Sequence, residues 1–379
     1  MAQSITPQAA LRMQRIEQAR QQALQHAAAL DPALIEPWIV RSWQRCLSLG
    51  LAPKQRVNFE AVGPHTLRRA EEANRTLVQA ARPVLEHLGR ALLDTRYFAI
   101  LTNQHGIVVD AHGPIDRSDR RADLITRIGT DLSETAVGTT AIGAALSELV
   151  PVWLHRGEHF FDDTSVYSCA GAPLFGPQGQ CVGMLDLTGV QALERPELRH
   201  LVVQAARHIE NALALQPSHA LLLRLNWPGR SMGDESDGLV GLDADGAIAC
   251  ANPIARQLLP ELNQPSVQPW HSRDLFAMPF EKFFDAARHD AAAMEVPLWS
   301  GLRLQVLART RQSALSAPGA AKSANPWHSE AAQNSPLKDV QAALIRRAVH
   351  DAKGNVAQAA RALGISRATV YRKLGRPPG

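Results

Sequence analysis

The stretch from Val356 to Leu374 restricts the fold of this chain more than any other. Its first half carries apolar residues at helical spacing, namely Val356, Ala359, Ala360 and Leu363. Gly364 then stands where a helix ends in a left-handed residue. Ser366 can cap a second helix whose buried side carries Val370 and Leu374. The pattern predicts two short helices packed across a tight turn.

The second of these helices leaves a basic and polar side open, formed by Arg367, Thr369, Arg372 and Lys373. Residues 334–379 hold nine Lys or Arg and two Asp, a net charge of +7, so with +4 overall the rest of the chain sums to −3. A helix in the DNA major groove needs short donors near its start for base edges and cations along its flank for phosphates. The sequence therefore predicts a DNA-binding unit, and the alternative is a plain helical hairpin with an incidentally basic face.

Together with a helix predicted from Leu337 to Ala352 and the link Lys353-Gly354-Asn355, this stretch resembles the Fis-type DNA-binding domain at the C-terminus of bacterial enhancer-binding activators. The resemblance covers residues 337–379 and implies an all-α helix-turn-helix. The contact positions that it implies are Ser366, Arg367, Thr369 and Arg372, with Asn355 and Gln358 near the flanking DNA backbone; the basic side of the second helix adds Lys373 as a candidate. We expect Arg367 to contact guanine, and Arg372 and Lys373 to meet phosphates.

Composition indicates a folded protein of two or three domains, because the 379 residues are 45% hydrophobic. The first residues do not show a basic region followed by an apolar one, and no apolar run approaches the length of a membrane span. We therefore expect a cytoplasmic protein without a membrane partner. The four cysteines lack C-x-x-C spacing, which favours buried apolar residues over a disulfide framework or a cysteine-based zinc site: Cys46, Cys169, Cys181 and Cys250.

Residues 1–93 are predicted to be a helical region. A first helix ends at Asp31-Pro32, and helical signal from residue 66 to 93 is bent or broken at Pro83. Between them, residues 39–53 form a short amphipathic helix in which Trp43 is expected to be buried.

From Tyr97 the pattern changes to short strand-like runs. Residues 98–102 and 106–110 flank a turn and predict a hairpin. A helix is expected over residues 134–146 and another from about 196 to 215. Further strand-like runs cover residues 150–154, 167–174 and 181–188.

Four phrases in this region, L-S-E-T-A-V-G-T-T-A-I-G, G-E-H-F, S-C-A-G-A-P-L and G-M-L-D-L-T-G, resemble the GAF sensor of the acetoin catabolism regulator family. With Arg-Ser-Trp-Gln-Arg-Cys upstream, the resemblance covers roughly residues 37 to 215, and we place the GAF domain at 94–215. It implies a small-metabolite effector such as a ketol, a polyol or an aromatic compound. Candidate effector-binding residues are Trp153, His159, Phe160 and Tyr167; for Trp153 and His159 the alternative is packing at the rim of a sheet.

One metal motif also occurs in this region. The segment from His155 to His159 spells H-x-x-E-H, which binds zinc when both histidines lie on one helix. Because Gly157 lies inside it and a strand-like run precedes it, we predict a loop and no metal site.

Residues 216–236 are predicted to be a linker, followed by a PAS-like α/β module at 237–308. The layout D-x-D-G-x-I-x-x-A-N-x-x-A-x-x-L-L from Asp243 to Leu259 resembles a PAS domain. It comprises a hairpin, a short helix that Asn252 can cap, and closing strands at 297–299 and 303–307. The module is a sensor, or a spacer and dimer module; no haem or flavin signature occurs, so we expect no cofactor. Residues 309–336 have the composition of a flexible tether.

The enhancer-binding family normally carries an ATPase between sensor and helix-turn-helix, and its phosphate loop has the pattern G-x-x-x-x-G-K-[ST]. That string does not occur in this sequence. We therefore expect an α+β multidomain, ligand-responsive DNA-binding regulator that does not remodel sigma-54 RNA polymerase by ATP hydrolysis. Its expected partners are operator DNA, a small-molecule effector, a second copy of the chain and RNA polymerase.

Two alternatives belong to other classes. The chain can be a sensor or adaptor that forms mixed dimers with a full-length activator. It can also be an enzyme built on the GAF fold, although no paired carboxylates or nucleophile-base spacing emerge, and we expect no catalytic residues.

Overall fold

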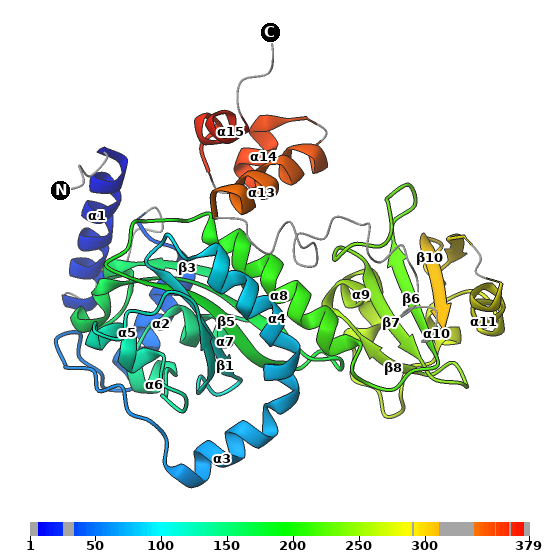
Figure 1. The fold of residues 1–379 in the computed structure, drawn as a ribbon, viewed down its shortest axis with the longest axis horizontal. Helices are drawn as coiled ribbons and strands as arrows, with labels where there is room; N and C mark the ends of the chain where they lie inside the picture. Colours follow the sequence, from blue (N-terminus) through cyan, green and yellow to red (C-terminus); the bar gives the residue numbers. More distant parts are fainter. Residues whose placement is uncertain are drawn as a thin grey trace.

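The structure, a computed structural model, describes residues 7–25, 34–289, 292–310, 337–352, 354–363 and 365–374, which form three units in chain order (Figure 1). Several predictions made from the sequence lie outside these residues. They are the helix end at Asp31-Pro32, residues 311–336 of the tether predicted at 309–336, Lys353 of the link, and the left-handed Gly364. The first two residues of that predicted tether, 309 and 310, instead end a strand. Among the helices of the described residues, none combines the length and apolar character needed to cross a membrane.

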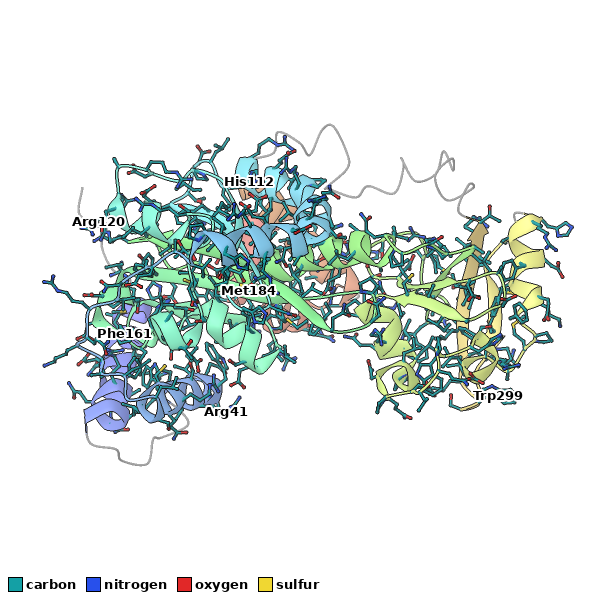
Figure 2. The ribbon with its side chains drawn as sticks, turned by 90° about the horizontal axis from the view of Figure 1, so that it is seen from below. Arg41, His112, Arg120, Phe161, Met184 and Trp299 are labelled. Atoms are coloured by element: carbon teal, nitrogen blue, oxygen red, sulfur yellow. The ribbon has the colours of Figure 1, made fainter. Side chains whose placement is uncertain are left out.

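The first unit is built on an antiparallel sheet of order β2-β1-β5-β4-β3. Its strands are β1 (Tyr97–Asn103), β2 (Val108–His112), β3 (Val152–His155), β4 (Tyr167–Phe175) and β5 (Cys181–Val190). The hairpin predicted over residues 98–110 is confirmed, since Ile100 pairs with Ala111. Alternate residues of β5 face opposite sides, with Leu185 and Leu187 in the cluster on one face and Met184 in the cluster on the other. Met184 is labelled in Figure 2.

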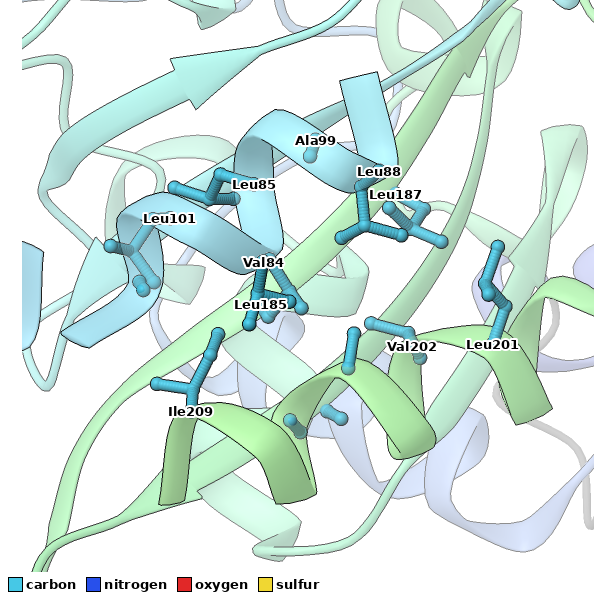
Figure 3. Packing of buried hydrophobic residues seen from close by; sticks show 14 of the residues in the cluster. Val84, Leu85, Leu88, Ala99, Leu101, Leu185, Leu187, Leu201, Val202 and Ile209 are labelled. Atoms are coloured by element: carbon cyan, nitrogen blue, oxygen red, sulfur yellow. The ribbon is translucent and has the colours of Figure 1, made fainter. Parts of the chain in front are cut away.

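One face of this sheet is covered by α4 (Arg75–Ala91) and α8 (Leu198–Ala214) (Figure 3). Val84 and Leu88 of α4 pack with Leu185 of β5 in one buried cluster. The helix α4, which falls in the helical region predicted over residues 1–93, therefore buries its apolar stripe against this sheet and α8. Of the bend or break predicted at Pro83, the break is wrong: α4 runs through Pro83, and the break lies at Asn74, after α3 (Pro64–Ala73).

The other face carries shorter helices, α5 (Arg120–Ile125), α6 (Glu134–Val137) and α7 (Ala141–Glu148). The single helix predicted over 134–146 is split, because Gly138 has φ +67° and any Cβ there would lie 2.8 Å from the Phe161 ring. Outside them lie α2 (Pro37–Ser48) and α1 (Pro7–Arg20), the latter followed by a π-helical turn (Gln21–Gln25). Short 3₁₀ turns, η2 (Arg156–Glu158) and η3 (Asp162–Val166), join β3 to β4.

The second unit is another antiparallel sheet, of order β8-β7-β6-β10-β9. Its strands are β6 (Leu221–Asn226), β7 (Gly238–Leu242), β8 (Ile248–Ala251), β9 (Met294–Pro297) and β10 (Arg303–Thr310). The linker predicted at 216–236 is wrong for β6, which is the central strand and buries Leu221, Leu223 and Leu225. The closing strand predicted at 297–299 lies earlier, and Trp299 instead projects, 69% exposed, at the far end of the unit (Figure 2).

The helices of the second unit are short: α9 (Pro253–Leu258), η4 (Pro260–Asn263), α10 (Ser272–Leu275) and α11 (Glu281–Arg288). Asn252 caps α9 as predicted, since its Oδ1 accepts the Ala255 N–H at 2.8 Å. Its Nδ2 also donates to Asn211 Oδ1 of α8 at 2.7 Å. One side chain therefore starts a helix and joins the second unit to the first.

The third unit comprises α13 (Leu337–Asp351), α14 (Val356–Ala362) and α15 (Arg367–Leu374). Its small core is formed by Ile345, Ala360, Leu363 and Val370. The two short helices predicted from the apolar spacing are confirmed.

Candidate DNA-binding surface and sensor cluster

The helix α15 begins at a side-chain cap. Ser366 Oγ accepts the Thr369 N–H at 3.1 Å and also lies 2.9 Å from Thr369 Oγ1. Val370, fully buried, ties the helix to α13 and α14. The cap and the buried valine fix which side of α15 faces outward.

The predicted DNA contacts differ in their exposure. Arg367 and Arg372 are exposed, whereas Thr369 and Lys373 are half-buried. Exposed Tyr371, which the sequence reasoning missed, lies between the arginines in the sequence and adds an aromatic ring to the surface. An exposed aromatic residue inside a basic helix is the signal that could have identified it.

The remaining predicted DNA contacts lie at the N-terminal ends of α14 and α15. Asn355 caps α14 by accepting the Gln358 N–H on Oδ1 at 3.1 Å. Gln358 and Ser366 are exposed. The structure thus places these three residues at helix starts, where backbone N–H groups also point outward and favour phosphate.

The four predicted effector residues do not converge on one place. Trp153 of β3 packs in the cluster of α4 and α8, on one face of the sheet. His159 and Tyr167 lie on the other side, with ring centroids 6.4 Å apart. Phe160 is fully buried among apolar residues of α1 and α2. Only His159 and Tyr167 therefore come together.

Next to His159 the structure shows a chain of buried polar groups that the sequence reasoning missed. We call it the polar cluster; its members are His159, Cys169, Asp186 and Thr188. Cys169 Sγ lies 3.5 Å from His159 Nε2 and 3.4 Å from Thr188 Oγ1, and the Thr188 hydroxyl donates to Asp186. The signal for it was the alternation in G-M-L-D-L-T-G, which puts Asp186 and Thr188 on the same face of β5.

Burial shifts the titratable members of the polar cluster toward their uncharged forms. Burial raises the pKa of Asp186 to about 7 and lowers the pKa of His159 to about 4. Burial also raises the pKa of the Cys169 thiol well above its usual range. Within the described part of the chain, Asp186 Oδ1 has no hydrogen-bond partner, nor has Thr102 Oγ1 on the neighbouring strand. Buried polar atoms without a partner are rare, so this face has unused capacity for hydrogen bonds.

The segment that carries His159 is fixed by α1. The Arg20 guanidinium donates to the carbonyls of Gly157 (2.9 Å), His159 (2.5 Å) and Phe160 (3.1 Å), and pairs with Asp162 at 2.6 Å. The H-x-x-E-H motif does not lie on an α-helix: His155 ends β3 and bonds Ser168, while Glu158 pairs with Arg12. The predicted loop is a 3₁₀ turn.

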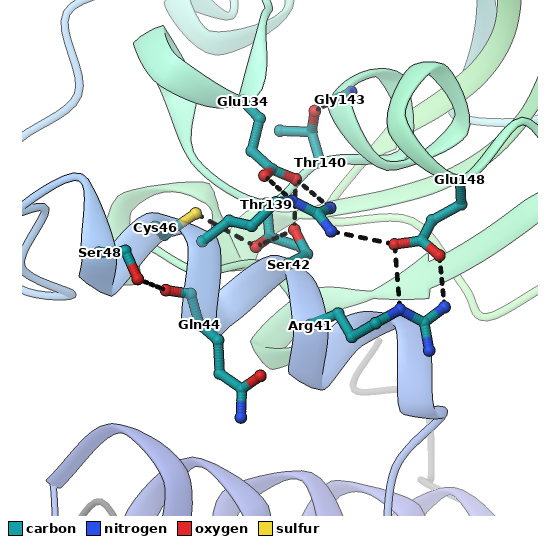
Figure 4. Close-up of polar contacts among 11 residues, drawn as sticks. Arg41, Ser42, Gln44, Cys46, Ser48, Glu134, Thr139, Thr140, Gly143 and Glu148 are labelled. Atoms are coloured by element: carbon teal, nitrogen blue, oxygen red, sulfur yellow. Dashed lines mark hydrogen bonds and ion pairs between the residues drawn. The ribbon is translucent and has the colours of Figure 1, made fainter.

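The arginines around Trp43 join α2 to α6 and α7 (Figure 4). Arg45 pairs with Glu134 at 2.6 Å and with Glu148 at 3.0 Å. Hydrogen bonds from Arg41 and then Arg45 lower the pKa of Glu148. Trp43 is buried, as predicted, and its indole N–H donates to the Glu158 carbonyl at 3.0 Å. These contacts are structural.

A small helical unit with a capped, basic outer helix, following an α/β unit with a buried polar cluster, is the arrangement of a transcription regulator with a sensor domain. Comparison with known families agrees. The chain belongs to the family described as "MimR, N-terminal domain", whose model matches residues 13–211. Residues 336–376 match the model described as "Bacterial regulatory protein, Fis family", so the Fis-type resemblance is confirmed.

Similar proteins carry regulator names. The "Acetoin catabolism regulatory protein" of Cupriavidus necator is 28% identical over 281 residues, covering 72% of this chain and 41% of that protein. The "Propane 2-monooxygenase operon transcriptional activator MimR" of Mycolicibacterium goodii is 30% identical over 250 residues, covering 65% and 41%. The chain therefore spans about two fifths of the length of these relatives.

A solved structure, the E. coli DhaR(N)-DhaL complex, matches 72% of this chain and 99% of its own, with 16% identity and a TM-score of 0.44.

Proposed function

We propose that this chain is a metabolite-responsive, sequence-specific DNA-binding regulator and not an enzyme. The observation that carries the proposal is the capped helix α15, which presents exposed Arg367 and Arg372 on a unit matched by the Fis-family model. The guanidinium of Arg367, near the start of a helix in the major groove, can donate two hydrogen bonds to one guanine. The guanidinium of Arg372, further along the helix, can bind a phosphate.

The proposed effector site is the polar cluster of the first unit, which we assign as a GAF sensor. Asp186 Oδ1 and Thr102 Oγ1 can each bond a ligand hydroxyl or carbonyl that supplies the missing partner. Since burial disfavours the charged forms of Asp186, His159 and Cys169, an uncharged small molecule such as a polyol or a ketol fits better than a charged one.

The proposed operator has two half-sites bound by a homodimer. A single helix-turn-helix buries little DNA surface, and two linked units gain affinity through their effective concentration. The second unit, PAS-like in its hairpin and helix, is proposed as the spacer between sensor and DNA-binding unit.

Regulation is proposed to occur without an ATPase within these residues. The sequence contains no G-x-x-x-x-G-K-[ST] string, and the small sheet of β6 to β10 occupies the region between sensor and helix-turn-helix. The same observation supports a second candidate, an adaptor that forms mixed dimers with a full-length activator.

The first experiment is to sequence genomic DNA fragments retained by the purified chain, beside an Arg367→Ala, Arg372→Ala variant as control. Discrete sites that the control loses support the regulator, and their neighbouring genes narrow the effector class. Equal retention by both proteins would overturn the proposed contacts and favour the adaptor.

A second experiment tests the effector site. A panel of small polyols and hydroxyketones is screened for a rise in the melting temperature, first with the unchanged chain, then with Asp186→Asn and Trp153→Phe. We expect the Asp186 variant to lose the response and the Trp153 variant, changed on the opposite face of the sheet, to keep it. The reverse result would move the site to the face of α4 and α8.

A further inference from the structure

The DNA-binding unit rests on the sensor unit at the start of α8, below α13 (Figure 1). His200 and Leu201 of α8 line one side of a narrow cleft, whose other side is lined by Leu363, Thr369 and Lys373. The cleft holds only about 40 Å³ of free space, so the two units are in close contact. Leu344 of α13 packs against the apolar cluster that α8 shares with the sheet.

An ion pair adds a second contact. Arg347 of α13 pairs with Asp234 at 3.3 Å and with Glu235, in the loop between β6 and β7. The Glu235 side chain is 5% exposed, so this pair is shielded from solvent on the acidic side. Asn211 of α8 donates to the Glu235 carbonyl at 3.5 Å. All three units therefore meet at this point.

The contact uses one flank of the helix that is proposed to enter DNA. Thr369 and Lys373 are four residues apart and share a side of α15, and both line the cleft with α8. Arg367 and Arg372 are exposed. A major groove about 12 Å wide must take up the whole helix, including both flanks. With one flank against α8, the helix cannot be seated in the groove.

We propose that the start of α8 is a docking surface for the DNA-binding unit and that docking and DNA binding exclude each other. The inference rests on the proposed DNA contacts of α15. Its consequence is that the described arrangement is a DNA-free state, which must open before an operator is bound.

Thiol labelling of the full chain measures the docking. A His200→Cys variant carries a thiol inside the contact, and an Arg199→Cys variant carries one on an exposed neighbouring position of the same helix as matched control. Labelling by a maleimide is followed peptide by peptide, so the four natural cysteines do not interfere. Adding Arg347→Glu should speed labelling at position 200 by about threefold to fivefold, and leave position 199 unchanged.

A variant with exchanged charges distinguishes loss of docking from misfolding. The triple variant Arg347→Glu, Asp234→Lys, Glu235→Lys restores opposite charges across the contact, and it should return position 200 to slow labelling. If Arg347→Glu leaves the labelling at position 200 unchanged, the docking surface is refuted.

A random-sequence DNA duplex at low salt tests the exclusion. Saturating duplex should speed labelling at position 200 in the His200→Cys variant that keeps Arg347, and Arg347→Glu should make the chain bind the duplex about threefold to fivefold more tightly. Unaltered or slower labelling with bound duplex overturns the exclusion. A duplex that binds the Arg367→Ala, Arg372→Ala variant as tightly as the unchanged chain refutes the DNA contacts instead, while the effect of Arg347→Glu on labelling still decides the docking.

Discussion

Replacing Asp186 by asparagine should remove a pH dependence that this buried carboxyl imposes on the stability of the sensor unit. Burial raises the pKa of Asp186 from 3.8 to about 7. The folded state therefore binds the proton more tightly than the unfolded chain, so this group reduces stability progressively as the pH rises from about 4 to about 7. A pKa change of that size corresponds to about 4 kcal/mol of unfolding free energy.

Asparagine never ionises and keeps an oxygen for the Thr188 hydroxyl. At about pH 8 the Asp186→Asn variant should unfold with about 4 kcal/mol more free energy than the unchanged chain, and near pH 4 the two should agree. Urea unfolding followed by tryptophan fluorescence measures this, since Trp43 and Trp153 report on the first unit.

The difference in unfolding free energy between the unchanged chain and Asp186→Asn reports on the Asp186 carboxyl alone, without the other titrating groups. Burial lowers the pKa of His87 to about 4 and of His155 to about 3, so both reduce stability as the pH falls below about 6.5. Both histidines are present in the unchanged chain and in the variant, so their contributions cancel in the difference. A difference that does not change with pH, or an asparagine variant less stable at about pH 8, would contradict the raised pKa of the buried Asp186.

Other substitutions test single contacts. Arg367→Ala should weaken operator binding by about 1 to 3 kcal/mol and relax the base preference at one position; competition with operator variants measures both, and unchanged affinity would count against the guanine contact. Arg372→Ala should lower the slope of log K against log salt by about 1, without altering the base preference. Ser366→Ala removes the cap of α15 and should lower the stability of the third unit by about 1 kcal/mol, seen in helix melting by circular dichroism. Arg20→Met should destabilise the first unit by about 3 kcal/mol because three carbonyls lose a charged donor, whereas Arg15→Met, exposed on the same helix, should have little effect; equal melting temperatures for the two variants would refute this.

Local sequence patterns predicted the third unit and the hairpins, because short apolar spacings, capping residues and glycine turns act over a few residues. They did not reveal β6. Its sequence L-L-L-R-L-N is flanked by proline and glycine, and its partner β10 lies far away along the chain. A central strand is defined by two neighbours, which no local pattern contains. For the same reason α4 was separated from the sheet that buries it.

The candidate effector residues show a second limit of prediction from sequence, which concerns the face of the sheet on which each residue lies. The candidate effector residues were taken from the segment between residues 153 and 167, but the position of a residue along a strand decides which face of the sheet its side chain lies on. Trp153 faces α4 and α8, whereas Leu154 and its partner Cys169 face α7. Asp186 was passed over because its neighbours are apolar, although a carboxyl in such a run is itself the exception that marks a buried site.

The contacts of Arg20 also imply that α1 becomes stable only after the segment that follows β3 has been synthesised. Its carbonyl partners lie 137 to 140 residues further along the chain, in the segment that follows β3. During synthesis α1 leaves the ribosome well before that segment exists, and a short helix with little buried surface has no stability of its own. A chain truncated before residue 157 should therefore leave α1 unfolded and open to proteases, even though every residue of the helix is present.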